Sequence, residues 1–218
     1  MISARHHFEN RHDLAISLAD AVGRALSATI TRKGHATLAV SGGNTPALFF
    51  MHLARQPITW DKVTVTLVDE RQVEETSESS NARLVKRHLM TEGAARATFV
   101  PLHGNVAQAA ALDLDVVVLG MGGDGHTASF FPEGDTLAEA IDQSTSQSII
   151  AISAPASGEP RLTFTLPRLL RAAHRFLHIE GNEKAAVLAK AEAGADRMAL
   201  PVRAVLQAPE ATEIYWCP

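Results

Sequence analysis

Residues 116–129 read VVVLGMGGDGHTAS, and this stretch indicates both the fold class and the candidate site. Four branched or long apolar residues, Val116 to Leu119, predict a buried strand. Glycines follow at once, and they permit positive φ and the close approach of main-chain N–H groups to a ligand. His126 is therefore expected just beyond the carboxyl end of a strand, where ligands bind in open α/β sheets. An imidazole at that position is suited to proton transfer near neutral pH.

The same glycines satisfy the dinucleotide-binding pattern G-x-G-x-x-G over residues 120–125, which is a weak signal when it stands alone. A dinucleotide-binding turn opens into a long helix and meets an acidic residue about 20 positions later, at the end of a second strand. Here residues 132–135 (PEGD) interrupt any helix within roughly two turns. Asp142, the later acid, does not end a strand-like run, so the context disfavours a dinucleotide.

The composition indicates a globular chain without a charge-driven partner. At 218 residues and 46% hydrophobic content it can bury one substantial core, and we expect a single α/β domain over residues 1–218. The net charge of -4, without a basic stripe, argues against nucleic acid. The single cysteine, Cys217, excludes an intramolecular disulfide, and no Cys or His spacing matches a zinc site, so no metal is expected. Residues 1–10 lack a signal-peptide core and no apolar run reaches membrane-spanning length, which predicts a soluble, cytoplasmic protein with no membrane partner.

Strand-like runs alternate with helix-like segments along the chain. This alternation predicts an α/β fold with a mostly parallel, Rossmann-like open sheet, helices on both faces and a few small edge strands. Helices are predicted over Asp13–Thr31 and Asn81–Met90, with a polar loop at Glu74–Ser80. Nine segments are strand candidates, more than the average sheet holds, so some are expected to be edge strands or wrongly assigned. They are Ala36–Val40, Val63–Val68, Thr98–Val100, Asp115–Leu119, Ser148–Ile152, Leu162–Leu166, Arg175–Ile179, Val202–Leu206 and Glu213–Trp216.

A second site motif, SGGNTP over residues 41–46, follows the first predicted strand. Pro46 opens a helical segment that runs through Ala54, since proline is favoured at the first helical position. Free N–H groups and the positive dipole end of a helix start favour phosphate, and Ser41, Asn44 and Thr45 add hydrogen-bonding side chains. The alternative is an ordinary helix cap. Two preceding glycines favour the phosphate interpretation.

Three charged residues, Asp69, Glu70 and Arg71, end the second predicted strand. Packing at a sheet terminus does not require three charges, so we expect them to face the same cleft. Arg71 is suited to neutralise an anionic substrate or a developing oxyanion, and Asp69 to orient a partner or act as a base. On this motif alone, a solvated charge cluster is an equally good interpretation.

Two basic residues stand beside later strand candidates. Arg161 begins an alternating strand segment that ends at Pro167. Lys184 lies where another strand ends and a helix starts, a position suited to phosphate, with an ordinary surface lysine as the alternative. The nine histidines other than His126, among them His178, show no metal-ligand spacing and are interpreted as surface or core residues.

Taken together, the motifs resemble those of the 6-phosphogluconolactonase family. That family carries, in this order, SGG-x-TP, VDER-x-V followed by SN, LGMG-x-DGHTAS-x-FP, R-x-T-x-T-x-P and G-x-x-K-A. The resemblance runs from about residue 36 to residue 186, and the histidine motif is its most specific part. Only ten residues, 105–114, precede the strand at Asp115, where relatives carry a longer helical excursion, so one covering helix is expected to be short. The matching segments are Ser41–Pro46, Val68–Val73 with Ser80-Asn81, Leu119–Pro132, Arg161–Pro167 and Gly181–Ala185.

The resemblance implies hydrolysis of 6-phospho-D-glucono-1,5-lactone to 6-phosphogluconate in the oxidative pentose phosphate pathway, with no metal or organic cofactor. His126 then acts first as general base and later as acid, oriented by Asp124 or a nearby carboxylate. Arg71 and N–H groups of the glycine turn, such as that of Gly123, are candidates for the oxyanion or the phosphate. No G-x-S-x-G elbow occurs, so direct attack by water is preferred to an acyl-enzyme. The residues implied to hold the 6-phosphate are Gly42, Gly43, Asn44, Thr45, Arg161 and Lys184, together with Ser41.

Two alternative functions remain open. A related family, the glucosamine-6-phosphate deaminases, shares the SGG-x-TP loop but resembles DGHIAFNEP after the histidine, whereas this chain reads DGHTASFFPE from Asp124. A non-catalytic phosphosugar sensor would keep the binding loop without the chemistry, and the presence of His126 and Arg71 argues against it. The expected partner is a small phosphorylated sugar lactone. Both a monomer and a weak dimer are compatible with the sequence.

Overall fold

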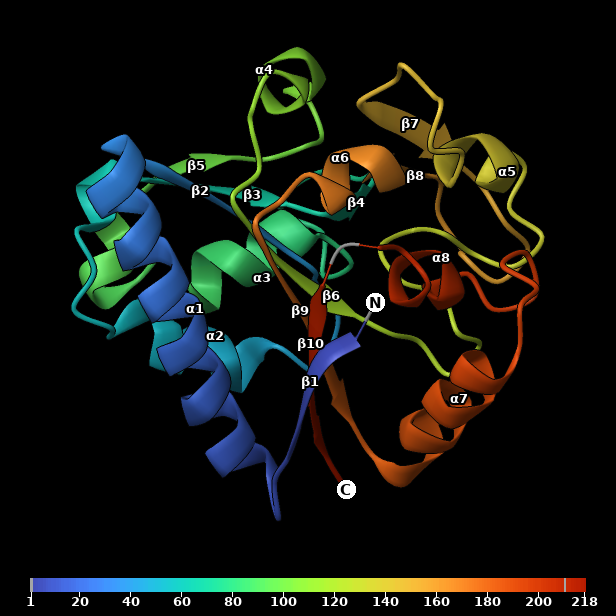
Figure 1. Cartoon of the computed structure of the whole chain (residues 1–218). Helices are drawn as coiled ribbons and strands as arrows, with labels where there is room; N and C mark the ends of the chain where they lie inside the picture. The colour runs from blue at the N-terminus through green and yellow to red at the C-terminus, as the bar shows by residue number, and fades with distance from the viewer. Residues whose placement is uncertain (1, 210) are drawn as a thin grey trace.

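The computed structural model describes residues 2–209 and 211–218, and its centre is a seven-stranded parallel sheet (Figure 1). The strand order is β1-β10-β9-β6-β2-β3-β5, and every neighbouring pair is parallel. The predicted α/β class with a mostly parallel open sheet is thereby confirmed. The strands are β1 (Ile2–His7), β2 (Ala36–Val40), β3 (Val63–Leu67), β5 (Thr98–Val100), β6 (Val116–Gly120), β9 (His174–Glu180) and β10 (Thr212–Cys217).

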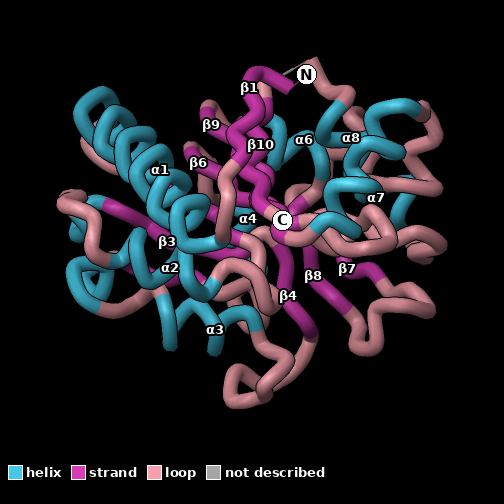
Figure 2. Tube along the Cα trace, turned by 90° about the horizontal axis from the view of Figure 1, so that it is seen from below, coloured by secondary structure: helices cyan, strands magenta, loops and turns pink. Residues whose placement is uncertain are grey.

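The middle of this sheet is covered on both faces. All five residues of β2 are buried, as are Val116 to Leu119 of β6, because helices on either side exclude water. Such continuous apolar runs are typical of parallel strands buried on both faces. Figure 2 shows α1 (Arg11–Lys33) and α2 (Ala47–Ala54) on one side and α7 (Asn182–Ala193) and α8 (Val202–Leu206) on the other. The shorter elements are α3 (Asn81–His88), α4 (Val106–Ala110), α5 (Leu137–Ala140), α6 (Leu166–Leu170), and the 3-10 turns η1 (Trp60–Lys62) and η2 (Glu92–Arg96).

Helix α1 is the long core helix that the four-residue spacing predicts. It begins where the side chain of Asn10 accepts hydrogen bonds from the N–H groups of His12 and Asp13, and it ends at Gly34 in the left-handed conformation, φ 84°. By length and composition α1 is also apolar enough to cross a membrane, but 61% of its most apolar window is buried inside the fold. That burial is what a core helix shows. Helix α4, in the segment expected to be shortened, has only five residues.

A small antiparallel sheet stands beside the main one, in the order β4-β8-β7. Its strands are β4 (Asp69–Arg71), β8 (Arg161–Phe164) and β7 (Ile149–Ile152). The chain enters β4 directly after β3, one residue beyond the main sheet. The register pairs Asp69 with Thr163 and Arg71 with Arg161, which brings two arginines of distant sequence segments together.

Three assignments differ from the sequence-based prediction. The segment predicted as a strand at Val202–Leu206 is helix α8, because Pro201 already has helical φ and ψ (-63° and -21°), and all five residues are buried. A short segment buried all round has no alternation that separates helix from strand. Strand β1 was missed because its outward residues are polar and its partner β10 lies at the other end of the chain. Strand β4 was missed because its three residues are all charged and pairing with β8 makes it a strand.

Candidate active site

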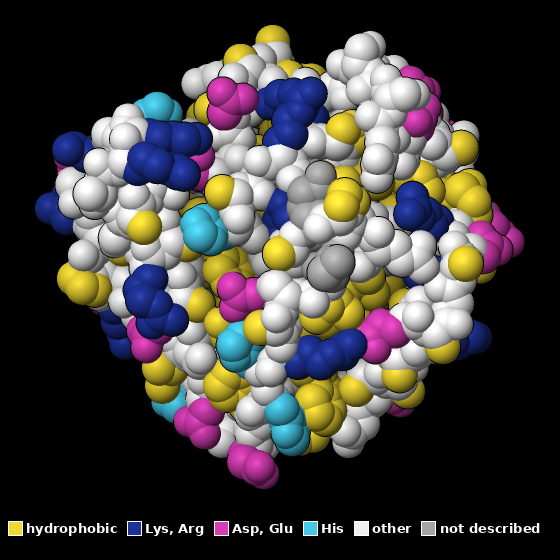
Figure 3. All heavy atoms as spheres, viewed as in Figure 1, with side chains coloured by type: hydrophobic (Ala, Val, Ile, Leu, Met, Phe, Trp, Pro, Cys, Tyr) yellow, Lys and Arg dark blue, Asp and Glu magenta, His cyan; other side chains and the backbone are white. Residues whose placement is uncertain are grey.

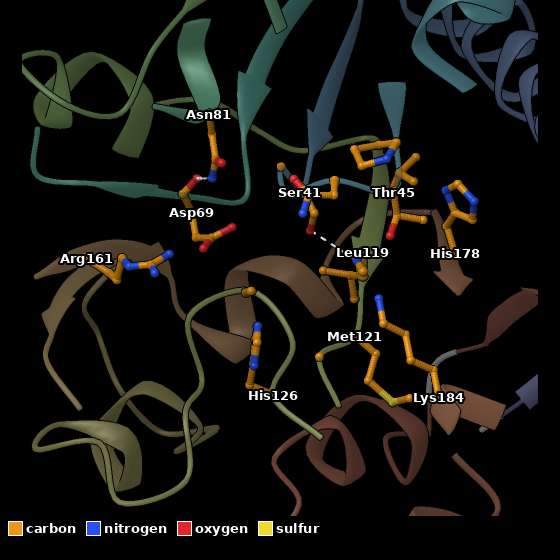
Figure 4. Close-up of a pocket in the computed structure, with 18 of the residues that line it drawn as sticks. Ser41, Thr45, Asp69, Asn81, Leu119, Met121, His126, Arg161, His178 and Lys184 are labelled. Atoms are coloured by element: carbon orange, nitrogen blue, oxygen red, sulfur yellow. Dashed lines mark hydrogen bonds between the residues drawn. The ribbon is translucent and has the colours of Figure 1, made fainter. Parts of the chain in front are cut away.

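A cavity of about 250 Å³ opens at the carboxyl edge of the main sheet, where β2 and β6 lie side by side (Figure 4). After β2 the chain adds its next strand of the main sheet, β3, on one side, and after β6 it adds β9 on the other side. Ligands of open α/β sheets bind at such points, where the order of strands reverses. Every site residue predicted from the sequence lines the cavity except Gly123 and Asp124. The lining comprises residues 41–46, Asp69, Arg71, Asn81, residues 118–122, His126, Ala128, Arg161, His178 and Lys184.

The turn that carries His126 is closed by its own backbone. The Gly122 N–H donates to the carbonyl of His126 (2.9 Å), and the Gly125 N–H donates to the carbonyl of Gly122 (3.1 Å). Gly125 has φ 77°, and a Cβ on Gly122 would lie 2.2 Å from Cε1 of His126. The Gly125 carbonyl in turn accepts from the N–H of Val202 (2.9 Å), which ties the turn to α8. Glycine is therefore required here both for backbone conformation and for space.

His126 and Asp124 form a hydrogen-bonded pair at the edge of the cavity. Nδ1 of His126 lies 2.6 Å from Oδ1 of Asp124, and the same oxygen accepts from the His126 N–H at 3.1 Å. Burial raises the pKa of Asp124, but the hydrogen bond and the charge of His126 outweigh it, and the net pKa is lowered. The carboxylate therefore accepts the Nδ1 proton and leaves Nε2 unprotonated in the neutral ring. The imidazole points into the cavity in Figure 4, with its side chain 30% exposed, so water can reach it.

Phe131 links His126 to Arg161. Its ring centroid lies 4.4 Å from that of His126, and Cζ of Arg161 lies 5.3 Å from the same ring. Arg161 is held by the carbonyls of Ser157 (2.7 Å from Nη2) and Glu159 (3.2 Å from Nε). Burial, followed by the nearby charge of Arg71, lowers the pKa of Arg161. Arginine stays charged under these conditions, so the cavity has a fixed cationic wall.

The acidic and basic residues of β4 form one hydrogen-bonded cluster. Asp69 accepts from the Ser129 hydroxyl at 2.6 Å, which joins β4 to the histidine loop. Arg71 donates through Nη1 to the Ser79 carbonyl and to Oδ1 of Asn81 (3.0 Å). The prediction that these charges face one cleft is confirmed for Asp69 and Arg71, which line the cavity.

Glu70 points the other way and holds the start of α3. Its buried carboxylate accepts from the N–H groups of Arg71 (2.8 Å), Asn81 (2.8 Å) and Ala82 (2.7 Å) and from the Ser80 hydroxyl (3.1 Å). Burial raises the pKa of Glu70, although these four hydrogen bonds act in the opposite direction. Glu70 is thus a structural anchor beneath Arg71 and Asn81, and it does not line the cavity.

The loop of residues 41–46 forms the opposite wall of the cavity. The Ser41 N–H donates to the Val118 carbonyl (2.9 Å), and the Ser41 hydroxyl accepts from the Gly120 N–H (3.2 Å), so the loop is fixed to β6. Gly43 has φ 89°. Helix α2 starts at Ala47, one residue later than predicted, and its cap position carries no side-chain hydrogen bond within the described chain. Thr45 of this loop, His178 and Lys184 stand on the same side of the cavity in Figure 4.

Two lining residues with polar side chains, Asn81 and His178, were not identified as site residues from the sequence. Asn81 was recognised only as part of a motif, and His178 was interpreted as surface or core. His178 is buried, its Nε2 lies 3.1 Å from Oε1 of Glu180, and its ring packs edge-on against Phe49. Its place near the carboxyl end of β9, three residues before Gly181, is the sequence signal that points to the cavity.

The surface and the side-chain chemistry narrow the class of ligand. In the face shown by Figure 3, lysines and arginines are interspersed with acidic side chains and form no continuous basic stripe. Among residues 2–209 and 211–218, no group of three or more His, Cys, Asp or Glu side chains could hold a metal ion. The cavity combines His126, which Asp124 contacts from outside the lining, with arginines on one side and a lysine with a helix start on the other. This combination suits a small anionic substrate and a proton-transfer reaction.

Known proteins resemble this chain over nearly its whole length. The family model described as glucosamine-6-phosphate isomerases/6-phosphogluconolactonase matches residues 9–216. A 6-phosphogluconolactonase from Rhizobium meliloti (strain 1021) is 50% identical over 232 residues, covering 100% of both chains. The crystal structure of a 6-phosphogluconolactonase from Shewanella baltica OS155 has a TM-score of 0.94 at 33% identity, again covering 100% of both chains. That of a putative 6-phosphogluconolactonase from Neisseria gonorrhoeae FA 1090 has a TM-score of 0.95 at 35% identity and the same coverage.

Proposed function

Because the chain belongs to the family of glucosamine-6-phosphate isomerases and 6-phosphogluconolactonases, we propose that it hydrolyses 6-phospho-D-glucono-1,5-lactone to 6-phospho-D-gluconate. This reaction belongs to the oxidative pentose phosphate pathway. The observation that carries the proposal is the His126–Asp124 pair in a cavity with cationic groups on both sides. One side would take the phosphate and the other the charge that develops on the lactone oxygen.

The proposed reaction begins with a water molecule beside His126. Nε2 takes a proton from this water while its oxygen adds to C1 of the lactone, and the carbonyl oxygen becomes an oxyanion. The intermediate then collapses, the bond between C1 and the ring oxygen breaks, and the imidazolium returns its proton to that oxygen. The product is the open-chain acid, whose carboxyl group loses a proton to solvent. Asp124 supports these steps because its carboxylate orients the ring and stabilises the imidazolium.

The phosphate is assigned to the side of the cavity formed by residues 41–46 and Lys184. Main-chain N–H groups at the start of α2 and the ammonium of Lys184 together favour a dianion. Arg161 is paired with Arg71 across the cavity from this loop, so we reassign it from the phosphate, which the family resemblance implied, and assign both arginines to the oxyanion and the product carboxylate. This arrangement places C1 of the sugar near His126.

One contact favours lactone hydrolysis over deamination of an amino sugar phosphate. In the motif DGHIAFNEP the glutamate follows the histidine by five residues, and in this chain that position is Phe131. Phe131 is buried and packs against His126, so it supplies no carboxylate for ring opening. The residues that follow the histidine instead fasten the loop, since the Thr127 hydroxyl donates to the Gly120 carbonyl (2.7 Å) and the Ser129 hydroxyl to Asp69.

We further propose that residues 1–218 act as one soluble, cytoplasmic domain that needs no metal or organic cofactor. The proposed chemistry supports this, because lactone hydrolysis requires only proton transfer and charge stabilisation. The burial of α1 within the fold supports a soluble protein.

The test is the hydrolysis rate of freshly generated 6-phosphogluconolactone above its spontaneous background. Wild-type turnover that falls by about 10²- to 10⁴-fold in His126→Ala, with circular dichroism unchanged, is the expected result. Wild-type protein that fails to accelerate hydrolysis would overturn the proposal. Ammonia release from glucosamine 6-phosphate, measured on the same preparation, would then identify a deaminase, and phosphosugar binding without turnover would identify a sensor.

A further inference from the structure

The side chain of Asn81 lies where three parts of the cavity wall meet. It is only 2% exposed, although it lines the cavity. Its Nδ2 donates to the main-chain carbonyl of Asp69 (2.8 Å), and its Oδ1 accepts from Nη1 of Arg71 (3.0 Å). A Cβ placed on Gly42 would lie 1.9 Å from the same Oδ1, so the loop of residues 41–46 packs directly against the amide. One side chain therefore contacts the main chain of Asp69, the side chain of Arg71 and the proposed phosphate loop.

The position of Asn81 is fixed from behind. Its N–H and that of Ala82 donate to the two oxygens of Glu70, at 2.8 and 2.7 Å. The amide orientation follows from its partners, because a carbonyl oxygen accepts only and an arginine donates only. A flipped amide would set its NH2 group against Arg71 and its oxygen against the Asp69 carbonyl. Only one amide orientation thus satisfies both partners, and it presents an acceptor to Arg71.

Arg71 is held along one edge of its guanidinium. Both of its hydrogen bonds, to the Ser79 carbonyl and to Asn81, use Nη1. Its Nε is buried without a hydrogen-bond partner among the described residues. Nη2 makes no hydrogen bond to the described residues and is not among the buried unpaired atoms, so this group of Arg71 remains for an oxyanion in the cavity. A long arginine side chain without such anchors would sample several rotamers and lose this alignment.

We propose that Asn81 is a positioning residue with two roles. It aligns Arg71 with the lactone carbonyl, and it sets the distance between Arg71 and the phosphate loop at Gly42. This inference rests on the proposed function for its chemical meaning. Asn81 acts through Arg71, and Arg71 is proposed to stabilise the negative charge on the lactone carbonyl oxygen, which is largest in the transition state. Its loss should therefore lower kcat more than it raises KM.

The kinetic test compares Asn81→Ala with Ser80→Ala. Ser80 belongs to the same helix start, where its hydroxyl donates to Glu70 and accepts from the Arg83 N–H, but it does not line the cavity. We expect kcat of Asn81→Ala to fall by up to about 100-fold, the effect of misplacing a catalytic group by about 1 Å, with KM within about threefold. Ser80→Ala should lower Tm while kcat stays within about twofold of wild type. Wild-type kcat in Asn81→Ala, or an equal loss of kcat in both variants, would overturn the inference.

A second measurement tests the positioning without any turnover. Nitrogen-15 NMR of arginine side chains reports whether rotation of a guanidinium is hindered, and Arg71→Lys identifies the Arg71 signals. We expect hindered Arg71 signals in wild type and in Ser80→Ala, and averaged signals in Asn81→Ala. Hindered rotation that persists in Asn81→Ala would contradict the inference. If the wild type fails to hydrolyse the lactone, the proposed function fails, whereas the NMR comparison still decides whether Asn81 holds Arg71.

Discussion

Nδ1 of His126 lies 2.6 Å from Oδ1 of Asp124, and both side chains belong to one tight glycine turn. Because the two residues are separated by a single glycine, Gly125, the backbone of the turn sets their distance. The carboxylate also accepts from the main-chain N–H of His126, so it cannot rotate away without losing two hydrogen bonds. The pair is therefore prepared for proton transfer before substrate arrives, and its Nε2 remains for water.

Replacement of Asp124 by asparagine should show whether activity depends on the carboxylate that orients His126 or only on the volume of the side chain. The amide keeps nearly the same volume but can present its NH2 group to Nδ1, which favours the wrong tautomer. We expect kcat to fall by roughly 10²- to 10⁴-fold, the range found when a base loses its function. The lactonase assay measures this, with Asp113→Asn, at an exposed aspartate, as the control that keeps wild-type kcat within about twofold. Equal rates for Asp124→Asn and wild type would exclude Asp124 as the orienting group.

The contribution of Asp124 to stability should depend on pH. The pKa of this carboxyl is lowered from its ordinary value of 3.8 in the folded protein. Its stabilising contribution is therefore present above the unfolded-state pKa and is lost as pH falls through the lowered folded pKa. Urea unfolding of wild type and Asp124→Asn, measured from about pH 7 down to about pH 3, should give a difference that shrinks on the acidic side. A difference that grows on acidification would contradict the sign of this shift.

Phe131 should matter for activity through both of its neighbours. In Phe131→Leu the apolar volume is largely kept, but the ring contacts with His126 and Arg161 are lost. Such contacts contribute about 0.5–1.5 kcal/mol each, so kcat/KM should fall by about tenfold. Phe130→Leu is the matched control, because Phe130 is fully buried and makes neither contact. It should lower Tm and leave kcat/KM within about twofold, and similar kinetics for the two variants would argue against a role for the Phe131 ring.

Lys184 should act on substrate affinity. A charged hydrogen bond to phosphate is worth about 1.5–3 kcal/mol, so Lys184→Met should raise KM by roughly 10- to 100-fold with kcat within about threefold. Inorganic phosphate, used as a competitive inhibitor, should lose affinity in parallel. The control is Lys190→Met, at an exposed lysine near the other end of α7. An unchanged KM in Lys184→Met would move the phosphate to the arginine side of the cavity.

Much of the fold can be predicted from local patterns, because buried parallel strands are continuously apolar. Residues 36–40 and 116–120 are recognisable in this way, and so is α1 from its four-residue spacing. The segment at Val202–Leu206 was wrongly predicted as a strand, since five consecutive buried residues carry no period. Strands β1 and β4 were missed because their strand character comes from distant partners, β10 and β8.

The residues of the candidate site also fall into two groups, those that local sequence predicts and those that depend on contacts between distant segments. Glycine turns, a strand-end histidine and a helix start are local features, and from them the sequence predicts that His126, Arg71 and residues 41–45 share a site; in the structure they line one cavity. Contacts between separate elements are visible only in three dimensions: Asn81 bridges Arg71 and Gly42, Phe131 lies between His126 and Arg161, and His178 lines the cavity. This difference arises because local sequence sets backbone conformation, whereas contacts between side chains depend on strand order and register.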